Sequence, residues 1–449
     1  MSSTIQADLV ARDQAHLIHP LHSRDEHRSA HVWVEGRGAV LIDAAGREYL
    51  DGLSGLWNVV VGHGRKELAA AAARQMETLA YCSGYSGSTN PRAIELGERL
   101  AATCYPSINR FFFTSGGGES SESAFKTARY YWKLRGRPEK TKVISRQWAY
   151  HGVTLAAMSA TGIASYWPMF EPRTPGFLHV ASPYPYRFEA PAGAPSQGIA
   201  AADTLADLIE REGPDTVAAF IAEPVQGAGG VIVPQDDYFP RIREICNRYD
   251  VLLIADEVIT GFGRTGKRFA LDHWGVEPDM VAFAKAITSG YVPFGGIGVS
   301  DPIAEALDAA PPDKKWMHAF TYSAHPVCCA VASANLDIIE NEGLIARAGS
   351  LGKRLLEGLK GLAGHPHVGD VRGLGLMCAV ELVEDKATKR EFDPSQAIGP
   401  KVHAETQRRG LFSRLRGDCF LLAPPFVTTE DQIDRCVAIL GESIEAVLG

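Results

Sequence analysis

Short apolar runs alternate with helical segments through much of the chain. The runs that predict β-strands are 110–114, 142–146, 177–180, 217–223, 251–256, 280–285 and 295–300. Between several of them lie segments with a helical pattern of apolar residues, such as 119–135 and 238–249. Apolar strands that alternate with helices predict an α/β fold, in which helices cover both faces of a mostly parallel sheet.

The pattern changes towards both ends of the chain. Residues 31–52 have the pattern of strands joined by Gly-containing turns, and the Pro- and Ala-rich stretch 188–201 predicts a surface excursion. After about residue 325, helical segments precede strand-rich regions at 369–384 and 419–427, which predicts a smaller α+β domain. The expected division is an N-terminal segment joining the small domain, a large domain and a C-terminal small domain, at 1–57, 58–322 and 323–449.

Composition places the chain among soluble enzymes. The 449 residues carry 45 basic and 53 acidic side chains, a net charge of −8, which argues against a nucleic-acid or anionic-membrane partner. The first residues lack the apolar core of a secretory signal, and no run reaches the ~18 apolar residues of a membrane helix. Eight cysteines without a CxxC pair indicate reduced thiols, so we expect a cytoplasmic protein.

Chemically active residues follow several of the predicted strands. In open α/β sheets, ligands bind beyond the carboxyl ends of the strands. The residues expected there are Ser115, Gly116, Gly117, Gly118, Tyr150, His151, Glu223, Asp256, Glu257 and Lys285. Lysine is rarely fully buried unless it is paired or has reacted. The alternative is a strand that surfaces at Lys285 and leaves this side chain in solvent.

A lysine beside an acid at a strand end suits an imine with an aldehyde cofactor. Pyridoxal phosphate (PLP) requires a lysine, a carboxylate on its pyridinium nitrogen, a phosphate cradle and packing against its ring. Lys285, Asp256, the Gly117–Gly118 loop and Tyr150 can supply these four groups. For the glycine loop, a plain turn before a capped helix remains the alternative.

Two further motifs suggest other ligands. The segment 261–268, GFGRTGKR, fits GxGxxG and part of a P-loop, but Arg268 stands where a P-loop needs Ser or Thr. A nucleotide-binding protein built on this segment remains a remote alternative. His16, His19 and His22 are spaced three apart, but Pro20 interrupts a helix there and no carboxylate or cysteine cluster accompanies them. We therefore expect no metal.

Motifs spread over nearly the whole length resemble those of class III aminotransferases, PLP enzymes of fold type I. The matching segments are 51–64, 150–152, 222–230, 252–266, 284–291 and 320–326. The resemblance implies a mostly parallel seven-stranded sheet in the large domain. Within the class, the chain looks most like ω-amino acid and amine:pyruvate transaminases. This implies ping-pong transfer of an amino group from an ω-amino acid, diamine or amine to pyruvate, giving alanine, in a homodimer with shared sites. The alternative is a relative with aminomutase, racemase or decarboxylase chemistry.

The resemblance also implies roles for individual residues. Lys285 would bond the cofactor and shuttle a proton, Asp256 would pair with the pyridinium, and Glu223 would lie near Asp256. Tyr150 and Val258 would pack on the two ring faces, with His151 also at the cofactor. Thr321 would reach the phosphate bound by the neighbouring subunit.

Substrate selection is expected to depend on a second group. Arg414, in the segment 410–418, occupies the position of an arginine that binds a carboxylate in one half-reaction and swings out in the other. A solvated loop arginine is the alternative. Leu56, Trp57 and Tyr85 would line an apolar pocket, and Leu21 would close its entrance. The sequence leaves open which amine is the donor. It also departs from the family at Gly118, where a hydroxyl residue is common.

Overall fold

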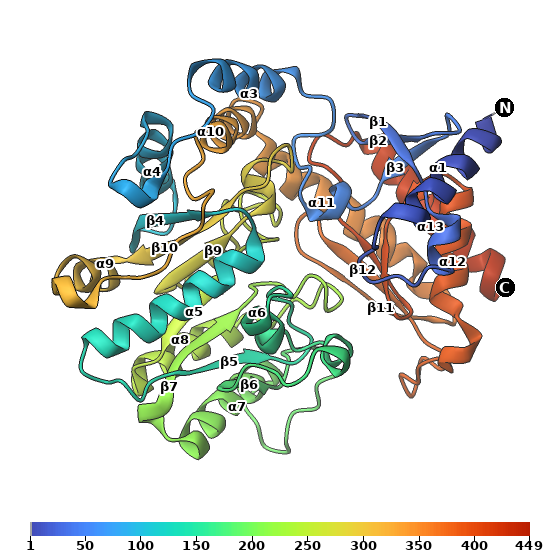
Figure 1. The fold of residues 1–449 in the computed structure, drawn as a ribbon. Coiled ribbons are helices and arrows are strands. Elements are labelled where there is room, and N and C mark those ends of the chain that lie inside the picture. The colour runs from blue at the N-terminus through green and yellow to red at the C-terminus, as the bar shows by residue number, and fades with distance from the viewer. Residues whose placement is uncertain (1) are drawn as a thin grey trace.

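The computed structural model describes residues 2–449, and its larger lobe is built on one seven-stranded sheet (Figure 1). Its strands correspond to the seven runs identified in the sequence. They are β4 (Ile108–Thr114), β5 (Lys142–Arg146), β6 (Phe177–Val180), β7 (Val217–Ala222), β8 (Leu252–Asp256), β9 (Met280–Phe283) and β10 (Gly295–Ser300). The order is β4-β10-β9-β8-β7-β5-β6, and β10 pairs antiparallel with both of its neighbours. The expected α/β fold with a mostly parallel sheet is confirmed.

Both faces of this sheet are covered, because its central strands β7, β8 and β9 are apolar apart from Asp256 at the end of β8. On one face, α5 (Gly117–Leu134) packs Phe125 and Trp132 against residues such as Ile221 and Ile254. On the other face, α7 (Gln197–Glu212) and α8 (Tyr238–Tyr249) pack against Phe220 and Leu253. Successive strand residues point to opposite faces, so two separate cores hold the strands in place.

Five further helices belong to the same lobe or border it. They are α3 (Lys66–Thr78), α4 (Pro91–Thr103), α6 (Leu155–Ala160), α9 (Asp301–Asp308) and α10 (Pro326–Asn341). Helix α10 packs against α3 and α4.

The smaller lobe combines segments from the N-terminal and C-terminal parts of the chain. One of its sheets has the order β1 (Trp33–Arg37), β2 (Val40–Asp43), β3 (Glu48–Asp51) and β13 (Leu411–Phe412), and β13 runs parallel to β3. The other has the order β11 (Val368–Gly373), β12 (Cys378–Leu382), β15 (Cys419–Leu422) and β14 (Arg414–Arg416). The helices outside the large lobe are α1 (Ser2–His16), α2 (Ser54–Trp57), α11 (Leu344–Lys360), α12 (Ile398–Arg408) and α13 (Glu430–Leu448). The domain boundaries given above stay a prediction.

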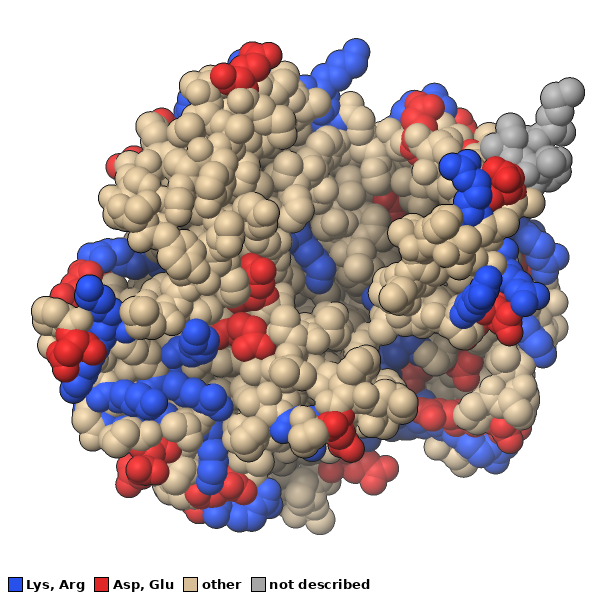
Figure 2. Space-filling view, viewed as in Figure 1, with Lys and Arg blue, Asp and Glu red and all other residues tan. Residues whose placement is uncertain are grey.

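None of the helices within residues 2–449 is long and apolar enough to cross a membrane. On the face shown in Figure 2, acidic and basic side chains are interspersed, and the surface is hollowed between the two lobes.

Candidate active site

The carboxyl ends of the parallel strands bring a lysine and two carboxylates together. Asp256 is the last residue of β8, Glu223 follows β7, and Lys285 lies two residues beyond β9 at the start of the short 3₁₀ helix η7 (Lys285–Ile287). The charges of Asp256 and Glu223 both act on Lys285. The fold therefore brings these residues together at one edge of the sheet, the rim, as the sequence predicts.

The strand predicted over 280–285 is two residues too long. Strand β9 ends at Phe283, and Lys285 has a φ of 49°, in the left-handed region that a strand cannot contain. For a residue with a side chain this conformation costs of order 1–3 kcal/mol, and such strain tends to occur at functional sites.

The amine of Lys285 is held in a reactive state. The pKa of Lys285 is lowered to about 8, chiefly by burial and in smaller part by the positive charge of Arg414, while the carboxylates of Asp256 and Glu223 act to raise it. Among the residues that the structure describes, none forms a hydrogen bond or salt bridge with its Nζ. About a tenth of this amine is therefore neutral at pH 7, far more than for an ordinary lysine, and the neutral form is the nucleophile.

A histidine fixes the carboxylate of Asp256. Nδ1 of His151 lies 2.6 Å from Oδ2 of Asp256, and the backbone N–H of Val258 donates to Oδ1 at 3.1 Å. Both side chains are buried, and Nε2 of His151 has no hydrogen-bond partner among residues 2–449. These contacts leave the carboxylate little freedom to rotate.

Glu223 ties the loop that carries Tyr150 to the end of β7. Its Oε1 accepts a hydrogen bond from the Tyr150 N–H at 3.0 Å, and its Oε2 accepts one from the Gly227 N–H at 2.9 Å. Burial raises the pKa of Glu223. The role of this acid in the fold is to position Tyr150 at the rim.

The glycine loop places the N-terminus of α5 at the same rim. A Cβ added to Gly117 would lie 2.8 Å from Cγ1 of Val258, and one added to Gly152, where φ is +121°, would lie 2.9 Å from the Cα of Gly118. Gly118 itself has room, because the nearest atom to an added Cβ is Cγ2 of Thr154 at 3.8 Å. A helix N-terminus that is this closely packed suits the binding of a phosphate through backbone N–H groups.

Two arginines of β14 face the loop that contains Tyr150. Arg414 is partly buried. Its charge acts to lower the pKa of Lys285, and it partly offsets the burial that raises the pKa of Tyr150. Arg416 instead places its guanidinium 3.9 Å from the ring centroid of Trp148. Within the described chain, neither arginine forms a salt bridge. Arg414 is thus the arginine of the pair whose charge reaches the rim.

The remaining predicted residues are not brought to Lys285 by a contact within one chain. Thr321, Tyr85, Leu56 and Leu21 are exposed, whereas Trp57 is only 1% exposed and belongs to a separate apolar cluster. The carbonyl of Thr321 accepts a hydrogen bond from the hydroxyl of Tyr81 at 2.9 Å. The roles assigned to these residues stay predictions.

Glu257 does not belong to the rim, although the sequence places it beside Asp256. Its carboxylate accepts hydrogen bonds from the hydroxyls of Tyr105 and Thr260 and, at 2.7 Å, from the backbone N–H of Ala270. Neighbouring residues at a strand end point to opposite sides, so Glu257 faces the core behind the sheet. Burial there raises its pKa to about 7.

The sequence did not reveal that Arg264, in the segment GFGRTG, has a structural role. Its Nη1 donates to the carbonyls of Leu376 at 3.0 Å and Pro424 at 2.7 Å, and its Nη2 donates to the hydroxyl of Ser54 at 3.0 Å. Burial lowers its pKa to about 9. Arg268 pairs with Glu340 at 3.0 Å. The segment anchors the two lobes to each other, which leaves the nucleotide-binding alternative without support.

Comparison with known proteins identifies the group to which this arrangement belongs. The family model for aminotransferase class-III matches residues 21–444. The chain belongs to the class-III aminotransferases. It is 46% identical over 414 residues to a probable aminotransferase of Mycobacterium tuberculosis, covering 91% of this chain and 88% of the relative. It is 40% identical to the putrescine–pyruvate aminotransferase of Pseudomonas aeruginosa, covering 93% and 91%.

Solved structures agree with this assignment. An (S)-enantioselective ω-transaminase from Thermomicrobium roseum is 50% identical, with a TM-score of 0.95 over 99% of both chains. Class-III aminotransferases use PLP, so this protein is a PLP-dependent transaminase. The rim fits that cofactor, because it offers a nucleophilic lysine, a fixed buried carboxylate and a helix N-terminus for a phosphate. The predicted family and cofactor are confirmed.

Proposed function

We propose that this aminotransferase transfers an amino group from an ω-amino acid, diamine or simple amine to pyruvate, giving alanine by a ping-pong mechanism. The observation that carries the proposal is Arg414, whose charge reaches Lys285 and Tyr150 and which forms no salt bridge within the described chain. The likeness to a putrescine–pyruvate aminotransferase and to an ω-transaminase supports it.

The residues of the rim would divide the work among them. When bound, PLP supplies an electron sink for the negative charge left by loss of a proton from the substrate carbon. Lys285 would bond the cofactor, then carry this proton between two carbons. Asp256, held by His151, would keep the ring nitrogen protonated through its negative charge.

Other groups would hold the cofactor in place. Tyr150 and Val258 would pack on the faces of the ring, with Glu223 near its hydroxyl edge. The backbone N–H groups at Gly117 and Gly118 would bind the phosphate. Val258 and Gly117 are close neighbours, which supports a shared site for ring packing and phosphate binding.

Arg414 would let one pocket accept two kinds of substrate. Its guanidinium can form a bidentate, charge-assisted pair with the carboxylate of pyruvate or alanine. With an amine that lacks a carboxylate, the side chain would turn away. Because Arg414 has no salt bridge to break within residues 2–449, this movement costs little. Leu56, Trp57 and Tyr85 would provide the apolar wall for the carbon chain of the amine, with Leu21 at the entrance.

The proposal includes a homodimer with shared active sites. Met317, Tyr322 and Tyr85 are 84%, 61% and 68% exposed in the single chain. Tyr85 and Thr321 belong to one surface region, because Tyr85 reaches the carbonyl of Ala319 at 3.5 Å. Exposed apolar side chains that gather in this way are typical of interfaces. A second copy that covers them would bring Thr321 to the phosphate of its neighbour.

A panel of amine donors tests the proposal. Each donor, including putrescine, β-alanine, 4-aminobutyrate, taurine and an aryl amine, is mixed with pyruvate, and alanine is measured by chromatography. Parallel reactions contain 2-oxoglutarate and are analysed for glutamate. We expect alanine from at least one donor, in clear excess over glutamate. Preferential glutamate would refute pyruvate as the acceptor. Donor conversion without either amino acid would indicate aminomutase, racemase or decarboxylase chemistry.

A further inference from the structure

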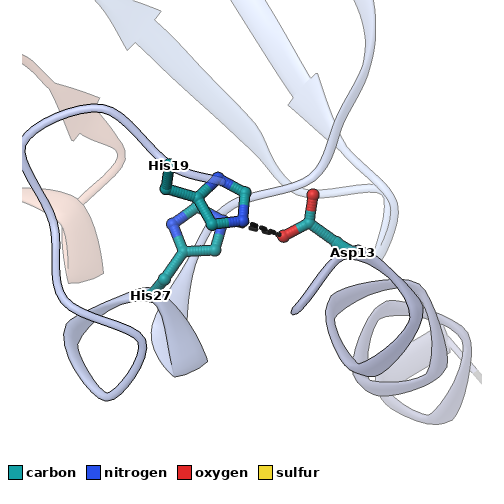
Figure 3. Close-up of side chains that lie close together, drawn as sticks. All are labelled: Asp13, His19 and His27. Atoms are coloured by element: carbon teal, nitrogen blue, oxygen red, sulfur yellow. Dashed lines mark ion pairs between the residues drawn. The ribbon is translucent and has the colours of Figure 1, made fainter. Parts of the chain in front are cut away.

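The N-terminal segment gathers three potential metal ligands far from the rim residues in sequence. Asp13 lies in α1, His19 follows this helix, and His27 lies in the 3₁₀ helix η1 (Glu26–Ser29). The two histidines direct Nε2 at one carboxylate oxygen, Oδ2 of Asp13, at 2.8 Å from His19 and 2.9 Å from His27 (Figure 3). The spacing of His16, His19 and His22 did not reveal this set, because the chain turns back after His19 and brings a later histidine into place.

Hydrogen bonding alone leaves these polar atoms poorly satisfied. Oδ2 of Asp13 and Nε2 of His19 are buried atoms without a correctly directed hydrogen bond among the described residues, although only 2.8 Å separates them. No lysine or arginine within residues 2–449 forms a salt bridge with Asp13. A buried polar atom without a partner destabilises the fold. A cation between the three side chains would satisfy all of them together.

The donor set indicates the class of cation. Two imidazoles and one carboxylate on one side of an ion are typical of divalent transition metals that keep their remaining positions open to water. With metal–ligand bonds of about 2.1 Å, neighbouring ligands lie about 3.0 Å apart in octahedral geometry and about 3.4 Å apart in tetrahedral geometry. The N···O separations of 2.8 and 2.9 Å are nearer to the octahedral value.

The loop that carries the ligands is already ordered by its own hydrogen bonds. Gln14 Nε2 donates to the carbonyl of Arg24 at 2.6 Å, and the Ser23 N–H donates to Oε2 of Glu26 at 2.7 Å. The imidazoles of His19 and His27 stack with their centroids 3.4 Å apart. Only the two rings would have to fan apart for their nitrogens to converge on an ion, because the backbone is in place.

We propose that Asp13, His19 and His27 bind one divalent transition-metal ion, with water in its remaining coordination positions. The ion clips the end of α1 to η1 and restrains the intervening loop, in which Leu21 lies. It replaces the expectation of no metal, which rested on a different trio of histidines. The site is independent of the proposed donor and acceptor, and its ligands belong to no part of the catalytic rim.

Titration of the tag-free, PLP-loaded enzyme with Co²⁺ tests the site. Protein treated with EDTA and dialysed is titrated by calorimetry, and the visible absorption of Co²⁺ is recorded at wavelengths beyond the cofactor bands. We expect one ion per chain, and at least tenfold weaker binding in Asp13→Asn and His19→Ala. The matched controls are His16→Ala and His22→Ala, which remove neighbouring imidazoles and should leave binding unchanged. Co²⁺ should raise Tm in the wild type and controls alone.

Three results would overturn the site. The first is the absence of binding at millimolar Co²⁺, and the second is unchanged binding in Asp13→Asn combined with His27→Ala. The third is an equal loss in His16→Ala, which would mean adventitious binding to surface histidines. Asp13→Asn preserves the shape of the side chain, and unchanged transaminase activity and circular dichroism would show that weaker binding does not arise from unfolding.

Discussion

Replacing Arg414 by alanine should weaken pyruvate binding while sparing a simple amine. The loss of a charge-assisted hydrogen bond costs about 1.5–3 kcal/mol, which corresponds to a rise in KM for pyruvate of about ten- to a hundredfold. The half-reaction with an amine that lacks a carboxylate should change little, because Arg414 would be turned away in that complex. Taurine and β-alanine should show an intermediate loss.

The structure adds a second readout that does not involve substrate. The charge of Arg414 acts to lower the pKa of Lys285, which is about 8 in the wild type. In Arg414→Ala the pKa of Lys285 should therefore be higher. Only the neutral amine attacks the cofactor aldehyde. The rate at which cofactor-free enzyme captures PLP should therefore rise with pH in both proteins, but at a higher pH in Arg414→Ala.

Stopped-flow absorbance of the two half-reactions measures the first effect, and the pH profile of PLP capture measures the second. Arg416→Ala is the matched control, because Arg416 lies on the same strand but stacks on Trp148 and is not among the charges that act on Lys285. Equal losses in both half-reactions of Arg414→Ala would refute selective recognition of the carboxylate. A pyruvate defect confined to Arg416→Ala would transfer the role to that residue.

Four further substitutions test the cofactor site. Lys285→Ala should abolish turnover while still holding PLP non-covalently, and borohydride reduction of the wild type should label Lys285 in peptide maps; a label on another lysine would contradict the assignment. Asp256→Asn should slow both half-reactions by orders of magnitude with an unchanged fold, because an amide cannot hold the pyridinium proton through its charge; near-normal single-turnover rates would make Asp256 a structural acid. Gly118→Ser should slow the loss of PLP during dialysis, because it supplies a hydroxyl where there is room. Gly117→Ser should speed this loss, because the added Cβ meets Val258 at 2.8 Å. The same effect in both variants would argue against phosphate binding by this loop.

Local patterns were sufficient to predict the central sheet. Its strands are short apolar runs, and each is recognisable without knowledge of its neighbours. The rim followed from the general rule that ligands bind at the carboxyl ends of strands, so Lys285, Asp256 and Glu223 could be named in advance. The stretch 188–201 was interpreted as a loop, but α7 begins at Gln197, where the hydroxyl of Ser196 accepts a hydrogen bond from the Ile199 N–H at 3.0 Å. That capping serine was a local signal that the Pro-rich context obscured.

Other features depend on contacts between distant parts of the chain. The direction of Glu257 is set by Tyr105, which lies 152 residues earlier. The Asp13 cluster requires the turn that returns His27 to α1. Arg264 could not be interpreted from GFGRTG because its partners come from the smaller lobe, Ser54 being 210 residues away and Pro424 160. Periodicity reports on neighbours within an element and carries no information about these pairings.

The contacts around Arg264 also determine the order in which the protein can be completed during synthesis. Ser54 donates a hydrogen bond to the carbonyl of Ala423 at 2.6 Å, a partner 369 residues later in the chain. The sheet that contains β3 is likewise incomplete until β13 has been synthesised. The ribosome therefore releases a continuous large lobe that can fold first, while β1, β2 and β3 can pair with one another but lack β13 until residues 411–412 have been made. Loss of the chain from β13 onward would accordingly remove the parallel partner of β3 and the carbonyl that Ser54 binds, and so destabilise the beginning of the chain as well as its end.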